Sequence, residues 1–261
     1  MTRFYVVGNL KMNMLSREEA SQYLTVLRRE SSSKRYAYVT GIIAPSFLYS
    51  AQFDDLPKSI KKGAQNMFPE KSGSYTGEIS PLMLKNDGVE YVIIGHSERR
   101  LYAGETDELI HEKLLSVLKY YMIPIVCIGE TRAQREAGKA EQIITGQIRT
   151  LFSDLSKLQA EKVIIAYEPR WAIGTDILPT TSEIAEVRMI VRQVLTEMFD
   201  TATEERIAVL YGGSVKSSLL PQVAFETGME GVLVGRESLF PYELVKMMNL
   251  FEEEAIRRSK I

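Results

Sequence analysis

Eight short apolar segments recur along the chain, and each is followed by a stretch long enough to hold a helix. Most of these segments are too apolar to have one exposed face, which is typical of parallel strands covered by helices on both sides. We predict strands at residues 4–7, 38–43, 62–65, 91–94, 123–128, 163–167, 207–211 and 232–234. Apolar residues with helical spacing predict helices at residues 16–29, 107–120, 137–155, 181–198 and 241–258.

This alternation predicts an α/β fold in a single domain spanning residues 1–261. The length matches a (β/α)8 barrel of eight parallel strands surrounded by helices, although periodicity alone also allows a doubly wound open sheet. Polar residues or glycines follow nearly every predicted strand, and a barrel would bring them to one mouth. They are Asn9, Lys11, Gln65, Asn66, His96, Glu130, Glu168, Gly212, Gly213, Ser214 and Gly235. We therefore favour the barrel.

The composition argues against several classes of function. With 32 basic and 34 acidic residues the formal charge is −2, so no overall field favours nucleic acid or an anionic membrane. The sequence has no GxGxxG or GxxxxGK loop, which argues against nicotinamide and nucleoside-triphosphate chemistry. Two histidines and one cysteine leave little for a metal site, and Cys127 lies in an apolar run where we expect an inert buried thiol. We expect chemistry from side chains alone, with no metal and no cofactor.

The amino-terminal segment has only four apolar residues, 4–7, before Gly8 and Asn9. That run is too short for the core of a signal peptide or for a membrane span. We therefore expect a cytoplasmic protein with no membrane partner.

Two glycine-rich turns come late in the chain, at residues 211–215 (Tyr-Gly-Gly-Ser-Val) and 234–236 (Val-Gly-Arg). After the last two strands of a barrel, such turns can bring backbone N–H groups close to a phosphate. Either turn alone could equally be an ordinary tight turn. Their occurrence in tandem favours a phosphate site.

Three side chains at strand ends are candidates for the chemistry. Glu168 directly follows a buried strand and precedes Pro169, which restricts it to extended geometry; a capping or salt-bridged glutamate is the alternative. His96 stands where a helical turn could begin, which would favour a neutral ring that donates to a substrate carbonyl, or it is a structural histidine. Lys11 could bind phosphate or an oxyanion, or be a solvated lysine.

Four segments together resemble the signature segments of the triosephosphate isomerase family, in the family's order and spacing. They are residues 8–13 (Gly-Asn-Leu-Lys-Met-Asn), 95–100 (Gly-His-Ser-Glu-Arg-Arg), 166–175 (Ala-Tyr-Glu-Pro-Arg-Trp-Ala-Ile-Gly-Thr) and 211–215. The resemblance runs from about residue 4 to residue 251, and residues 167–175 are close to diagnostic. It implies a cofactor-free glycolytic and gluconeogenic enzyme that interconverts dihydroxyacetone phosphate and glyceraldehyde 3-phosphate through an enediolate.

The resemblance also implies roles for individual residues. Glu168 would take a proton from the carbon next to the carbonyl, and neutral His96 would move protons between the enediolate oxygens. Lys11 and Asn9 would stabilise the enediolate, and Glu98 would orient the site from behind. Backbone N–H groups would hold the phosphate, namely those of Gly174, Ser214, Gly235 and Arg236. A lid that excludes water would span residues 170–179, including Arg170, Trp171, Ala172, Ile173, Gly174 and Thr175.

The resemblance further implies a homodimer, in which the loop between Ser72 and Glu78 inserts beside the active site of the partner subunit. Thr76 would then lie near Asn9 and Lys11 of the partner subunit.

Two single positions and one four-residue segment depart from the family's usual pattern. Leu10 stands where the family usually has tryptophan, and we expect this change to alter packing only. Residues 176–179 (Asp-Ile-Leu-Pro) stand where the family usually has Gly-Lys-Thr-Ala, which leaves the energetics of lid closure open. Arg236 replaces a residue that is often glycine, but its expected phosphate contact is made by the backbone.

Two other functions compete with this interpretation. A different sugar-phosphate isomerase on a barrel could share the tandem phosphate turns, but it would not explain Lys11, His96 and Glu168 together. A non-catalytic phosphate-binding or interaction protein on the same fold would be expected to have lost the base or the histidine. Neither residue is lost.

Overall fold

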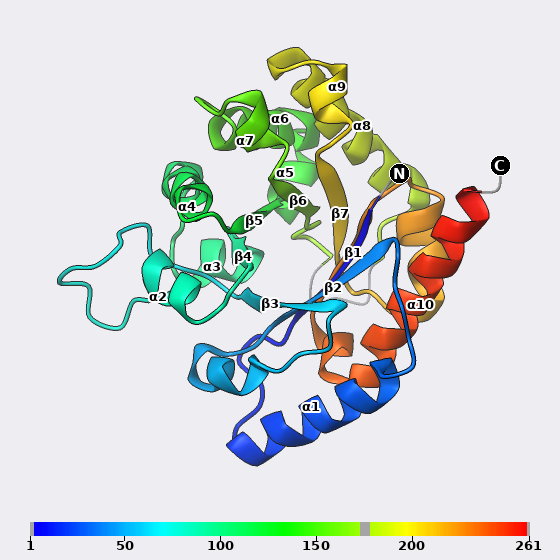
Figure 1. Ribbon diagram of the computed structural model, residues 1–261. Coiled ribbons are helices and arrows are strands. Elements are labelled where there is room, and N and C mark those ends of the chain that lie inside the picture. The colour runs from blue at the N-terminus through cyan, green and yellow to red at the C-terminus, as the bar shows by residue number, and fades with distance from the viewer. Residues whose placement is uncertain (1–2, 173–177, 260–261) are drawn as a thin grey trace.

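The computed structural model describes residues 3–172 and 178–259, and their strands form a closed parallel barrel (Figure 1). The strands are β1 (Phe4–Asn9), β2 (Val39–Ala44), β3 (Ile60–Ala64), β4 (Tyr91–Ile94), β5 (Ile123–Ile128), β6 (Ile164–Tyr167), β7 (Ala208–Gly213) and β8 (Gly231–Val234). Each strand pairs with the next along the chain, and β8 pairs with β1, where Tyr5 lies opposite Gly231. This closure confirms the predicted (β/α)8 barrel and rules out the doubly wound open sheet.

Helices surround the barrel and cover its outer face (Figure 1). The α-helices are α1 (Arg17–Ser31), α2 (Pro81–Asn86), α3 (Ser97–Tyr102), α4 (Asp107–Lys119), α5 (Arg132–Glu136), α6 (Ala140–Leu151), α7 (Lys157–Ala160), α8 (Thr181–Met198), α9 (Thr201–Glu204) and α10 (Pro241–Arg258). Short 3-10 turns form η1 (Phe47–Phe53), η2 (Ser217–Leu219) and η4 (Arg236–Leu239), and η3 (Pro221–Phe225) is a π-helical turn. The bounds predicted for α8 and α10 are confirmed.

The predicted helix at residues 137–155 has the wrong bounds. The chain forms α5 and α6 instead, and Gly138 between them has a φ of 67°, which a right-handed helix cannot contain. At the other end α6 stops at Leu151, and Asp154 has a φ of 59°. The helical spacing of apolar residues continues across both breaks. A prediction from that spacing alone therefore merged segments that the backbone separates.

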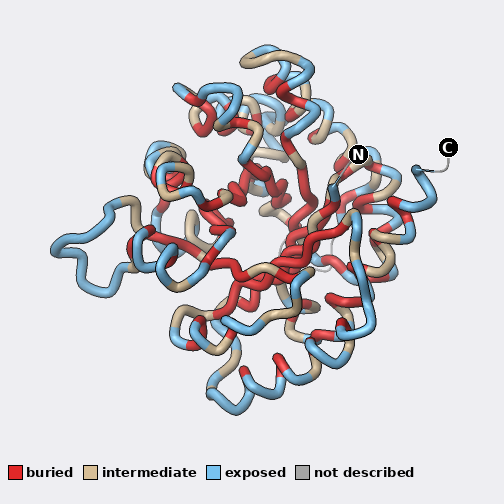
Figure 2. Tube along the Cα trace, viewed as in Figure 1, coloured by how far each residue is buried: buried red, intermediate tan, exposed pale blue. Residues whose placement is uncertain are grey.

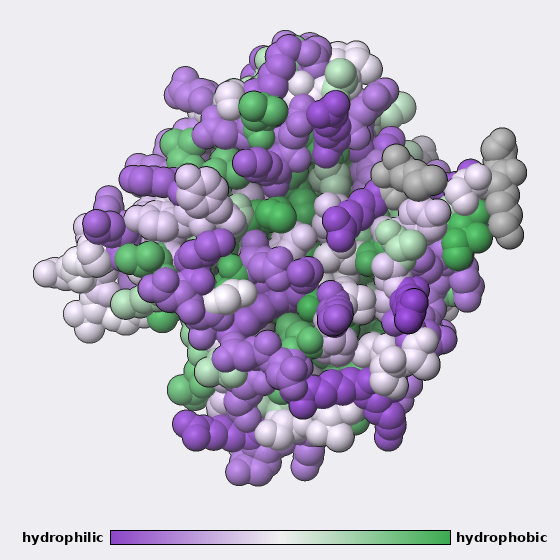
Figure 3. Space-filling model, viewed as in Figure 1, coloured by the Kyte–Doolittle hydropathy of each residue, from purple (hydrophilic) through white to green (hydrophobic). Residues whose placement is uncertain are grey.

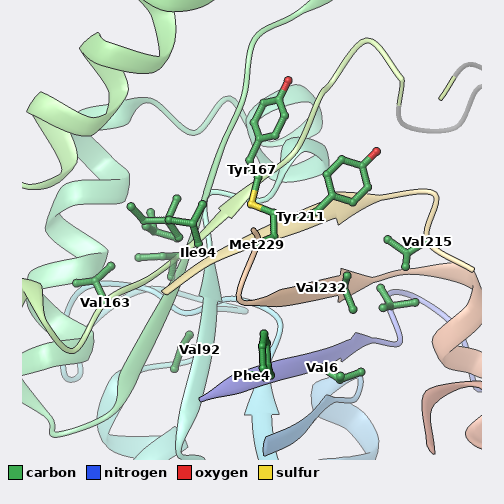
Figure 4. Close-up of a cluster of buried hydrophobic side chains, with 14 of the residues drawn as sticks. Phe4, Val6, Val92, Ile94, Val163, Tyr167, Tyr211, Val215, Met229 and Val232 are labelled. Carbon is green, nitrogen blue, oxygen red and sulfur yellow. The ribbon is translucent and has the colours of Figure 1, made fainter. Parts of the chain in front are cut away.

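The core has two apolar layers, one inside the barrel and one between the barrel and its helices, and Figure 2 shows the strands as the buried centre of the molecule. The inner layer includes Val7, Ile42, Ile93, Ile125 and Leu210. Figure 4 shows part of the outer layer, with Phe4, Val6, Val92, Ile94 and Val232 among its labelled side chains. Strands with both faces buried explain why the predicted segments read as continuous apolar runs.

Leu10 follows β1 and is completely buried in the outer layer. Its side chain therefore packs in the core, and the expected effect of this departure on packing stays a prediction.

The loop between β3 and α2 stands away from the barrel. Residues 71–78, between β3 and α2, are exposed and extend from the body of the molecule (Figures 1 and 2). On the face shown in Figure 3, hydrophilic side chains predominate and hydrophobic ones are scattered. Within residues 3–172 and 178–259, no helix has the length and hydropathy needed to cross a membrane.

Candidate active site

Glu168 lies just beyond the carboxyl end of β6, and its side chain is almost completely buried. Its Oε2 accepts a hydrogen bond from the backbone N–H of Ser97 at 2.8 Å, and its Oε1 lies 3.1 Å from Nε2 of His96. Two glycines make room for it: a Cβ on Gly129 would lie 1.8 Å from the Glu168 carbonyl oxygen, and one on Gly212 would lie 2.9 Å from Cγ. The carboxylate is thus held at a fixed place in the barrel mouth.

His96 is the N-cap of α3, as the prediction of a helical turn required. Its Nδ1 accepts a hydrogen bond from the backbone N–H of Glu98 at 3.2 Å. A ring nitrogen that accepts a hydrogen bond carries no proton, so this arrangement assigns a neutral ring with its proton on Nε2. The Nε2–H group points at Glu168 and is available to donate to an oxygen in the pocket.

Lys11 follows β1 in a left-handed backbone conformation, with a φ of 51°. Hydrogen bonds hold this conformation: its N–H donates to Oδ1 of Asn9 at 3.0 Å, and its carbonyl accepts from Nε2 of Gln65 at 2.9 Å. A non-glycine residue in this region is strained and persists where its surroundings fix it. Its Nζ lies 2.7 Å from Oε1 of Glu98. Lys11 is therefore a positioned cation and not a freely solvated lysine.

A pocket of about 720 Å³ joins these side chains to the two glycine-rich turns. The predicted catalytic and phosphate-binding residues that the structure describes all line it: Asn9, Lys11, His96, Glu98, Glu168, Ser214, Gly235 and Arg236. The predicted lid residues Arg170, Trp171 and Ala172 are not among its lining residues. Ser214 follows β7, Gly235 follows β8, and Arg236 is the first residue of η4. The tandem turns thus share one pocket with His96 and Glu168.

Part of the predicted lid can be placed. Arg170 and Trp171 are half-buried and Ala172 is buried, directly after Glu168 and Pro169. Ile173, Gly174 and Thr175, together with Asp176 and Ile177 of the unusual segment, lie outside the described residues. The chain is described again from Leu178, which also lines the pocket.

Cys127 lies on β5 and is completely buried. Burial raises the pKa of the Cys127 thiol well above its usual value, and the negative charge of Glu168 adds to the shift. The thiol is therefore unreactive at neutral pH, as predicted.

Several functional contacts were not predicted from the sequence. The backbone N–H of Ser97 holds Glu168, and a backbone donor leaves no signal in side-chain type. The side-chain amide of Gln65 donates to the backbone carbonyl of Lys11; Gln65 was noted at a strand end, but its partner was not predicted. A cluster around Glu130 and Arg135 beside Trp171 was also missed. Glu130 was noted at a strand end, but nothing in the sequence pointed to Arg135.

Comparisons with known proteins agree with this geometry. A family model described as triosephosphate isomerase matches residues 4–251. The chain belongs to the triosephosphate isomerase family. A triosephosphate isomerase of Dictyoglomus thermophilum is 43% identical over 243 residues, covering 92% of this chain and 96% of the relative. Those of Thermoanaerobacter pseudethanolicus and Clostridium botulinum are 38% and 39% identical and cover 95% and 94% of this chain and 100% and 98% of the relatives. The range matched by the family is the range over which the resemblance was predicted.

Proposed function

We propose that this chain interconverts dihydroxyacetone phosphate and D-glyceraldehyde 3-phosphate through an enediolate, with Glu168 as the base. Membership of the family and the names of the relatives support the activity. The observation that carries the residue assignment is the buried Glu168 carboxylate 3.1 Å from the neutral His96 ring. This division of base and neutral acid is the established one for triosephosphate isomerases.

The resting hydrogen bond between these two residues suggests how the reaction begins. The Nε2–H of His96 faces Oε1 of Glu168, so an incoming substrate carbonyl would replace that oxygen as acceptor. Oε1 would then be free to take a proton from the adjacent carbon and return it to the neighbouring carbon. His96 would meanwhile donate to one enediolate oxygen and recover a proton from the other.

Lys11 would stabilise the negative charge of the enediolate. Its ammonium group is fixed by Glu98 at 2.7 Å, so little reorganisation is needed when charge develops in the pocket. Asn9 is buried and holds the backbone of Lys11 through its side-chain oxygen. Asn9 and Glu98 would therefore orient the cation, in addition to the stabilisation of the enediolate that the resemblance implies for Asn9.

The phosphate would be bound at the glycine-rich end of the pocket. Ser214, Gly235 and Arg236 border the pocket there, and we propose that their backbone N–H groups bind it together with that of Gly174. Residues 170–179 would cover the bound enediolate and exclude water, because an exposed enediolate can eliminate its phosphate.

A coupled assay with D-glyceraldehyde 3-phosphate tests the activity directly. We expect turnover without added metal or cofactor. The alternative, a non-catalytic phosphate-binding or interaction protein on the same fold, predicts binding of triose phosphate with no conversion. Among residues 3–172 and 178–259, no contact favours that alternative over the enzyme.

We also propose a cytoplasmic homodimer. Many exposed large apolar side chains come from the segments that follow β1 to β4: Met12, Leu15, Leu48, Tyr75, Leu82, Met83, Leu101 and Tyr102. The exposed loop of residues 72–78 belongs to the same part of the chain, and its Gly77 and Glu78 border a second pocket that also contains Lys11 and His96. Burying this surface against a second copy would remove it from water. Sedimentation that shows a fully active monomer at micromolar concentration would contradict the dimer.

A further inference from the structure

Glu130 is a completely buried carboxylate just beyond the carboxyl end of β5. Its Oε1 accepts hydrogen bonds from the hydroxyl of Tyr167 at 3.1 Å and from Nε1 of Trp171 at 2.7 Å. Tyr167 immediately precedes Glu168, and Trp171 follows it by three positions. One buried oxygen atom therefore holds both sides of the turn that carries the proposed base.

Arg135, on α5, is the cation that compensates this buried charge. Its Nη1 donates to Oε1 of Glu130 at 3.1 Å, and its guanidinium lies 4.5 Å from the centre of the Trp171 ring. Among the described residues, no other cation forms an ion pair with Glu130. Arg135 thus contacts Trp171 directly through a cation–π interaction. It is also linked to Trp171 indirectly, because the Glu130 carboxylate accepts from both the guanidinium and the indole N–H.

The same guanidinium also reaches the start of α8. Its Nη2 donates to Glu183, whose other carboxylate oxygen accepts from the backbone N–H and the hydroxyl of Thr180, at 2.7 and 3.0 Å. Thr180 and Glu183 form the capping box of α8. Burial lowers the pKa of Arg135, but hydrogen bonds and charge from Glu183, with a further hydrogen bond from Glu130, outweigh it and raise the pKa. The group therefore remains charged throughout the physiological range.

We propose that Arg135 is a positioning residue for Glu168, which fixes the turn of residues 167–171 through Glu130 and Trp171 and ties that turn to the first turn of α8. The proposal rests on the proposed isomerase function, in which Glu168 is the base. Without Arg135, the Glu130 carboxylate would be left in the core with no cation. It would have to bind a proton or admit water, and in either case its hold on Tyr167 and Trp171 would weaken.

The chain contains one tryptophan, so Trp171 reports on this cluster without interference. In Arg135→Ala we expect red-shifted tryptophan emission and stronger quenching by acrylamide, because the ring loses the guanidinium above it. We expect kcat to fall between about 10-fold and about 100-fold, the range for a displaced catalytic group, and KM to change less than about threefold. Arg135→Lys keeps the charge but not the planar fork, so its kcat should lie between those of Arg135→Ala and the wild type.

The matched control is Arg149→Ala, which removes another arginine paired with a glutamate of α8, Glu197, on an exposed face. It should leave both tryptophan emission and kcat unchanged. If Arg135→Ala fails to fold, Arg135→Lys is compared with the wild type. We then expect a smaller red shift of tryptophan emission and a smaller fall in kcat.

Wild-type emission together with a kcat within twofold of the wild type in Arg135→Ala would overturn the positioning role. If Arg135→Ala does not fold, the same result in Arg135→Lys would overturn it. An emission shift with unchanged kcat would overturn it as well, because the contact would then be structural only. A wild-type chain without isomerase activity refutes the proposed function, and the emission measurement still reports whether Arg135 fixes Trp171.

Discussion

Nε2 of His96 lies 3.1 Å from Oε1 of Glu168, and both side chains are less than 10% exposed, at 7% and 4%. The proton between them belongs to His96, because its other ring nitrogen accepts from the N–H of Glu98. The groups proposed as acid and base therefore share a hydrogen bond before substrate arrives. We propose that productive binding of substrate breaks this hydrogen bond. Substitutions of His96 and of Glu168 then test the proposed acid and the proposed base separately.

We predict that His96→Gln lowers kcat by about 10²-fold or more, the usual scale for a positioned acid–base group. A glutamine amide can donate to a carbonyl, but it cannot exchange protons between two oxygens as an imidazole can. His111→Gln is the matched control, because His111 lies on α4 and its Nδ1 contacts the carbonyl of Leu151. Steady-state assays should show a normal kcat for the control. Retention of most activity in His96→Gln would return His96 to a structural role.

Glu168→Asp should lower kcat by about 10²-fold, because it retracts the carboxylate by about 1 Å. Substrate binding should change far less, since the proposed phosphate site at Ser214, Gly235 and Arg236 is left intact. Glu197→Asp, on the exposed side of α8, applies the same change away from the site. An unchanged kcat in Glu168→Asp would falsify Glu168 as the base.

The pH dependence of stability can be predicted at Glu254 on α10. Hydrogen bonds from Arg257, and then from Arg258, outweigh burial and lower the pKa of Glu254 from 4.5 to about 2. A carboxylate with a lowered folded-state pKa stabilises the fold above its unfolded pKa, here 4.5, and this contribution is lost as the pH falls towards 2.

Glu254→Gln should therefore lower the free energy of unfolding at pH 7, by less than about 1 kcal/mol because both arginines are partly exposed. The difference from the wild type should shrink as the pH is lowered from 4.5 to 3. Urea unfolding at one protein concentration measures it. A difference that stays constant between pH 7 and pH 3 would contradict the lowered pKa.

The barrel was predictable because its strands are buried on both faces, so short apolar runs mark them within two residues of their observed ends. The closure of the sheet into a barrel was predictable only indirectly. Polar residues such as Lys11 and Glu168 follow different strands, and a closed barrel brings such residues together at one end. The break at Gly138 was not, because the apolar spacing continues through it.

The proposed site was predictable where a polar side chain stands at or just beyond a strand end, as Glu168 and His96 do. Arg135 was not, because its partner Glu183 lies 48 positions away and charged residues on a short helix usually mark a solvated face. Only the folded chain brings Arg135 to Trp171.

The last prediction concerns the segment of residues 176–179, where this chain departs from the family at the carboxyl end of the proposed lid. Pro179 is buried, its ring fixes its own φ near −65°, and it biases Leu178 away from helical geometry. We therefore expect a hinge with fewer conformations than the usual Gly-Lys-Thr-Ala. Restricting one residue changes free energy by about 0.4 to 1 kcal/mol, less than the roughly 1.36 kcal/mol that corresponds to tenfold in rate.

Pro179→Ala should accordingly change kcat by less than about tenfold, in either direction. Deletion of residues 172–175 should instead nearly abolish isomerisation and release inorganic phosphate, because the enediolate would then be exposed to water. Isomerisation and phosphate release are measured together in both variants. If the deletion variant isomerises normally and releases no extra phosphate, residues 170–179 are not a catalytic lid, and water must be excluded from the enediolate by other parts of the pocket.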